Sequence, residues 1–115
     1  MQPNIHVIGD ACAAGAMPKA GFAANAQAKV CAAAMLRLMG GQKPDEPRLI
    51  NTCYTIVAPD YGITVAAVYR PVNGQLVEVQ GSAGTSPVEA PTSTREQEAK
   101  FADGWFKTIT GEIFG

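Results

Sequence analysis

The chain has 115 residues, 47% of them hydrophobic and 17% charged, so it is too apolar to be disordered and short enough to be one domain or part of one. Its formal net charge of −1 gives no bulk reason to expect a nucleic-acid or anionic-membrane partner. Lys29 and Arg37 interrupt the longest alanine-rich region, so no apolar run is long enough to span a bilayer. The opening residues also lack the basic and apolar regions of a signal peptide.

The first candidate element is an apolar run at residues 5–8, which predicts a buried strand of the parallel type ending at Gly9-Asp10. A glycine- and alanine-rich turn follows, and a helix is predicted from Pro18 to about Met39. Open α/β sheets use this order of strand, glycine turn and helix start to bind anionic or electron-rich ligands. Asp10 is well placed there to accept hydrogen bonds from a sugar or polyol hydroxyl.

The predicted helix is apolar on two sides. Phe22, Ala26 and Val30 recur on one side at helical spacing, and Ala23, Ala34 and Leu38 make the other side apolar too. Such a helix needs cover on more than one face, and one parallel strand cannot supply it. We therefore expect residues 1–41 to be the end of a larger α/β domain, and the isolated chain to self-associate.

The rest of the chain, residues 42–115, predicts an α+β domain. A proline-punctuated link at 42–50 precedes three β-rich runs at 52–58, 63–70 and 75–80, which predict an antiparallel meander. The turns between these runs contain Pro59-Asp60-Tyr61-Gly62 and the hairpin dipeptide Asn73-Gly74. After a loop at 81–92, Ser93 and Glu96 fit a capping box, and a helix follows whose predicted apolar stripe consists of Phe101, Trp105, Ile109 and Ile113.

The three cysteines, Cys12, Cys31 and Cys53, form an odd count without CxxC spacing, and His6 is the sole histidine. This pattern does not predict a zinc site. Two interpretations remain for each cysteine: a buried thiol, which is the commoner case, or a thiol whose partner lies outside the chain.

Three segments together resemble the C-terminal part of the flavoprotein subunit of flavocytochrome c sulfide dehydrogenase. The first joins His6–Ala11 to Ala16–Asn25, the second joins Asn51–Tyr54 to Tyr61–Pro71, and the third is Trp105-Phe106 with the closing Phe114-Gly115. The resemblance covers nearly the whole chain and implies kinship with glutathione reductase and sulfide:quinone oxidoreductase.

The resemblance implies an FAD site at the N-terminal turn. It places Gly9 and Asp10 beside the ribityl and pyrophosphate groups of FAD, and Met17, Pro18 and Lys19 beside the flavin carbonyl and N1. The physics agrees, because reduced flavin carries negative charge near N1 and a helix N-terminus stabilises it. For Lys19 the alternative is an ordinary solvated lysine.

The resemblance also implies that Cys53 is one half of a redox-active disulfide whose partner lies outside this chain. Sulfide would attack that disulfide, and electrons would pass to FAD and then to a cytochrome c subunit in the periplasm. Trp105 matches a tryptophan near the flavin, although core packing is the commoner role for such a residue.

The chain departs from the family in lacking a Gly-x-Gly-x-x-Gly motif for the ADP half of FAD. We therefore expect the isolated chain to bind FAD weakly or not at all, and to be inactive. Two alternatives stay open: a non-enzymatic α+β module for oligomerisation or docking, and a related flavoprotein acting on another disulfide or on a quinone.

Overall fold

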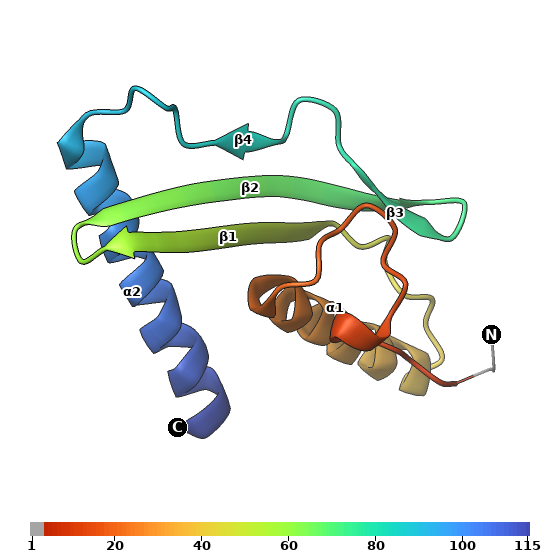
Figure 1. The fold of residues 1–115 in the computed structure, drawn as a ribbon. Helices are drawn as coiled ribbons and strands as arrows, with labels where there is room; N and C mark the ends of the chain where they lie inside the picture. Colours follow the sequence, from red (N-terminus) through yellow and green to blue (C-terminus); the bar gives the residue numbers. More distant parts are fainter. Residues whose placement is uncertain (1–3) are drawn as a thin grey trace. The chain divides into compact units, whose positions relative to one another are not determined.

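The computed structural model describes residues 4–115, and its class is α+β, as predicted. Two compact units are described separately below: Met1–Asn51 with Ala67–Ala83, and Thr52–Ala66 with Gly84–Gly115. The chain follows the order η1 (Gly9–Ala11, a short 3₁₀ turn), α1 (Gly21–Met39), β1 (Leu49–Ala58), β2 (Tyr61–Val72), β3 (Gln75–Glu78), β4 (Gly84–Thr85) and α2 (Thr92–Phe114), as Figure 1 shows.

The sheet contains the predicted meander in the order β1-β2-β3, and β4 also pairs with β2. In the first unit β3 runs antiparallel to the end of β2, with Val72 opposite Gln75. The two residues between them, Asn73 and Gly74, have φ of 50° and 80°. Positive φ at both central positions is typical of the type I′ turn, so the Asn-Gly hairpin is confirmed.

The prediction of a buried strand at residues 5–8 is wrong. These residues are exposed (64% for Ile5 and 57% for Val7), and no strand is assigned to them. Ile8 is extended, with φ −132° and ψ 171°. An extended segment becomes a strand only by hydrogen bonding to a neighbour, and within residues 4–115 no strand pairs with this one.

Helix α1 begins at Gly21, three residues later than predicted, and ends where predicted. Its C-terminus is a Schellman motif: the Gln42 N–H donates to the Arg37 carbonyl at 2.8 Å, and the Gly41 N–H donates to the Leu38 carbonyl at 3.0 Å. Gly41 has φ +69°, which glycine adopts without strain.

The core of the first unit lies between the start of α1 and the sheet residues of that unit. Its buried members are Met17, Ala23, Leu49, Ala67 and Tyr69, and Val30 and Leu76 pack against them. The far end of α1 is exposed, at 71% for Leu36 and 82% for Met39. Within this unit, therefore, only the first half of the two-sided helix receives cover.

In the second unit α2 buries Arg95, Ala99 and Ala102. Two predictions fail here. The helix begins at Thr92 after Pro91 with no side-chain cap, so Ser93 lies inside the first turn and no capping box forms. Of the predicted apolar stripe, Trp105 and Ile109 are half-buried, but Phe101 and Ile113 are more than half exposed.

The buried face of α2 differs from the predicted one because the backbone of α2 lies very close to Gly62 on β2. A Cβ placed on this buried strand residue would lie 2.5 Å from the Ala99 backbone nitrogen and 2.7 Å from the Glu98 carbonyl carbon. Strand and helix backbones this close leave room for alanine and none for an aromatic ring. Small residues therefore occupy the contact, and Phe101 is turned away from it.

Serine side chains tie the loop after β3 to β2. In the first unit, the Ser82 hydroxyl accepts the Val68 N–H at 3.0 Å. In the second unit, the Ser86 hydroxyl accepts the Thr64 N–H at 2.7 Å, and the Ser86 N–H donates to the Thr64 carbonyl at 2.9 Å. These hydrogen bonds extend the pairing with β2 to both sides of the short β4. They attach the predicted loop at 81–92 to the sheet.

Candidate functional site

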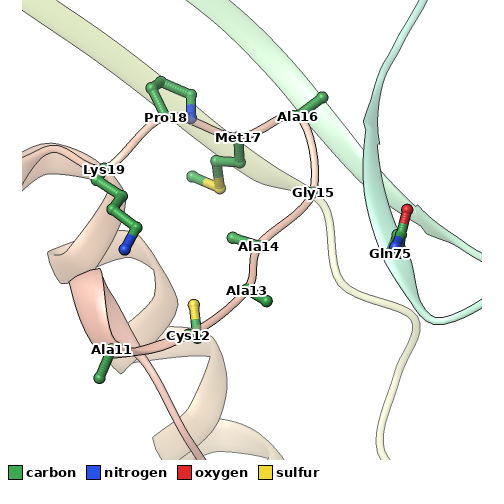
Figure 2. A pocket seen from close by; sticks show the side chains of 10 residues that line it. All are labelled: Ala11, Cys12, Ala13, Ala14, Gly15, Ala16, Met17, Pro18, Lys19 and Gln75. Atoms are coloured by element: carbon green, nitrogen blue, oxygen red, sulfur yellow. The ribbon is translucent and has the colours of Figure 1, made fainter.

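The candidate site is the loop between η1 and α1, which surrounds a hollow of about 680 Å³ in the first unit. Residues 11–19 line the hollow, and Gln75 closes it from the β2–β3 hairpin. Figure 2 shows the side chains of Cys12, Met17 and Lys19 turned toward the inside of this loop. A narrow crevice beside it brings Gly9 and Asp10 together with Pro18, Lys19 and Gln27.

Gly9 is held by a buried glutamine. Its N–H donates to Gln27 Oε1 at 2.7 Å, and its φ of +67° is in the left-handed region that glycine adopts without strain. The Gly9 carbonyl accepts the Cys12 N–H at 3.1 Å, which closes the 3₁₀ turn. The turn after residue 8 thus has the glycine geometry that the sequence predicted, although no strand precedes it.

Lys19 and Asp10 lie together at this turn. Lys19 Nζ donates to the Asp10 backbone carbonyl at 2.6 Å, so the ammonium bridges the two ends of the loop. The Asp10 residue is exposed, and no partner for its carboxylate is found among residues 4–115. One cation and one carboxylate with open acceptor sites therefore stand side by side at the surface.

Gln27 is the residue of this site that the sequence analysis missed. It is 8% exposed, in the middle of α1, and its Nε2 donates to Met17 Sδ at 3.6 Å. The Cys12 thiol donates to the same Oε1 that Gly9 uses, at 3.5 Å. A signal existed: Gln27 follows Ala23 by one helical turn, so it is a polar residue on an otherwise apolar face.

The opposite side of the loop is anchored on β3. The Ala16 N–H donates to the Leu76 carbonyl at 2.9 Å. Gly15, with φ +66°, passes so close that a Cβ there would lie 2.5 Å from the Leu76 carbonyl oxygen. The loop therefore rests on two supports, Gln27 on α1 and Leu76 on β3.

Helix α1 starts after the predicted site residues, not at them. Met17, Pro18 and Lys19 precede the helix, and the N-cap is Ala20, which is extended and makes no side-chain cap. No acidic residue lies in the first turn. Because no acidic side chain lies in this first turn, no carboxylate neutralises the positive end of the helix.

Cys53 and Trp105 belong to the second unit, so the structure does not place them relative to the loop. Cys53 is a half-buried thiol on β1. The next residue, Tyr54, contacts the Trp105 ring, with ring centroids 6.0 Å apart and an interplanar angle of 38°. This contact accounts for part of the burial of Trp105.

Three further observations concern the described part of the chain. No disulfide joins the cysteines of residues 4–115, and within the same range no cluster of three or more His, Cys, Asp or Glu could hold a metal ion. Across these residues, neither helix is long and apolar enough to cross a bilayer.

A family model described as flavocytochrome c sulphide dehydrogenase, flavin-binding, matches residues 45–114. The match includes Cys53, Trp105, all four strands of the sheet and all of α2. It begins after the loop that carries Gly9, Asp10 and Lys19.

Proposed function

The chain belongs to the flavin-binding family of flavocytochrome c sulphide dehydrogenase, and from this premise we propose that it forms the flavin-facing part of an FAD-dependent sulfide dehydrogenase. The family match over residues 45–114 carries the proposal. A flavoprotein oxidoreductase role follows from the family, and the substrate and residue roles below are the proposed part.

Some groups in the loop of the first unit suit parts of the FAD molecule and support this proposal. The open carboxylate of Asp10 suits a ribityl hydroxyl, and the start of α1, which has no acidic residue in its first turn, suits the electron-rich pyrimidine edge of the ring. The Lys19 ammonium, held on the Asp10 carbonyl, adds a fixed positive charge next to them. We assign Gly9, Asp10, Met17, Pro18 and Lys19 to FAD binding on this chemical fit.

Bound FAD supplies the two-electron acceptor of the reaction. Cys53 supplies one sulfur of a disulfide with a cysteine outside these 115 residues. Hydrosulfide attack breaks the S–S bond and forms a new one, leaving a persulfide on one cysteine and a thiolate on the other. Trp105, whose ring contacts Tyr54 on β1, is assigned to the surroundings of the flavin, as the family resemblance implies.

The remaining elements of the proposal concern the whole protein. Electrons leave through a cytochrome c subunit, and the periplasm is the compartment in which such a disulfide persists. The isolated 115-residue chain binds FAD weakly and does not turn over sulfide.

An anaerobic titration of the FAD-loaded protein with sulfide tests this function. Bleaching of the flavin absorbance by sulfide is expected in the wild type and is expected to disappear in Cys53→Ala. The matched control is Cys31→Ala, another half-buried cysteine, which should bleach like the wild type. Unchanged bleaching in Cys53→Ala would remove Cys53 from the mechanism. Bleaching by another thiol in place of sulfide, or reoxidation of the reduced flavin by a quinone, would point to the related oxidoreductase.

A further inference from the structure

We propose that Gln27 is a positioning residue for the loop between η1 and α1, which we call the flavin-facing loop. Its side-chain amide binds both ends of this loop to α1. This inference rests on the proposed function for its flavin part, and it gives a role to a buried polar side chain that the family assignment leaves unexplained. Gln27 lies outside the matched residues 45–114.

The contacts of Gln27 use both halves of its amide. The oxygen accepts the Gly9 N–H at 2.7 Å and the Cys12 thiol at 3.5 Å. The nitrogen donates to Met17 Sδ at 3.6 Å. Gly9 precedes the hollow and Met17 lies near its end, so one side chain fixes the entry and the exit of the loop.

Burial makes this role specific to an amide. Gln27 is 8% exposed and lies in an alanine-rich segment of α1, and Met17, which precedes the helix, is 3% exposed. A buried polar group is costly unless its hydrogen bonds are made. A leucine of similar size would fill the space, but it would leave the Gly9 N–H without its acceptor. Packing alone therefore does not explain a glutamine at this position.

Gln27 affects the Asp10 carboxylate and the Lys19 ammonium through the backbone of the loop. Asp10 follows Gly9 directly, and Lys19 is two residues from Met17 and donates to the Asp10 carbonyl at 2.6 Å. Gln27 contacts neither the Asp10 carboxylate nor the Lys19 ammonium. Gln27 fixes the backbone positions from which both side chains extend, so its effect on a flavin is indirect.

Backbone-amide NMR of the 115-residue chain tests this proposal with two readouts. The first is the hydrogen-exchange rate of the Gly9 amide without ligand, and the second is the shift of the Asp10 and Lys19 amides during titration with FAD. The variants are Gln27→Leu, which removes the acceptor, and Gln27→Glu, which keeps one. Gln97→Leu, the same substitution at an exposed position of α2, is the control.

In Gln27→Leu we expect Gly9 exchange to be about tenfold faster, as the loss of one hydrogen bond implies. We also expect its FAD-induced shifts at Asp10 and Lys19 to be lost. Gln27→Glu should restore the slow exchange, and Gln97→Leu should match the wild type. If Gln27→Leu keeps both the slow exchange and the FAD shifts, the positioning role is wrong. If the wild type shows no FAD shifts while Gly9 exchange still depends on Gln27, Gln27 positions the loop of the unliganded chain, and the weak FAD binding that we propose for the isolated chain is wrong.

Discussion

Replacing Gly62 with alanine tests the closest approach in the second unit. The added Cβ would lie 2.5, 2.7 and 3.0 Å from three backbone atoms of Glu98 and Ala99. Atoms in van der Waals contact lie about 3.5 Å apart or more, so β2 and α2 would have to separate by roughly 1 Å. A backbone cannot rotate away as a side chain can. We therefore expect a loss near the upper end of the overpacking range, about 3 kcal/mol.

The assay is urea denaturation followed by far-UV circular dichroism, which gives the free energy of unfolding. The matched control is Gly104→Ala in α2, where an added Cβ meets nothing within 4 Å. This control should stabilise the chain by roughly 0.5–1 kcal/mol, because glycine is a poor helix former. A Gly62→Ala variant as stable as the wild type would show that α2 does not rest on β2 at this point.

Three further predictions use the same measurements. Arg95→Met should lower the free energy of unfolding by about 3 kcal/mol or more, because it leaves the Glu98 carboxylate without its ion-pair partner. The pair is 3.3 Å long and buried, with side-chain exposures of 4% and 14%. A urea midpoint equal to that of the wild type would refute a stabilising role for this pair. Gly15→Ala should destabilise more than Gly41→Ala, since both have positive φ but only the first meets a backbone oxygen, and equal losses would contradict the contact with Leu76. The isolated chain should self-associate through the apolar hollow of about 800 Å³ between residues 5–14, α1 and β3, and a strict monomer in concentration-dependent light scattering would count against this.

Features set by a few neighbouring residues could be predicted from the sequence. The Asn73-Gly74 turn and the Gly40-Gly41 helix end both depend on positive φ, which is a local property of these residues. The α+β class and the order of the meander could be predicted because such turn and helix-end residues separate the elements along the chain. The assignment of Gly9, Asp10, Met17, Pro18 and Lys19 to FAD binding came from the resemblance and stays a prediction.

The features that failed depend on residues far away in the chain. A strand at residues 5–8 needs a hydrogen-bonding neighbour, which no pattern inside the run reveals. The buried face of α2 follows from its approach to Gly62, thirty-seven positions before Ala99. Gln27 binds residues ten and eighteen positions earlier, and only its place on an apolar face gave a signal.

The state of Cys53 in the oxidised FAD-loaded protein tests the central claim most directly. The protein is alkylated under denaturing conditions before and after anaerobic addition of sulfide, digested, and the Cys53 peptide is identified by mass. The account predicts that Cys53 is blocked at first, in a disulfide with a cysteine outside these 115 residues. After sulfide it should appear as an alkylated thiol or persulfide, together with flavin bleaching. A Cys53 that is fully alkylated in the oxidised protein, before any sulfide is added, would contradict the account.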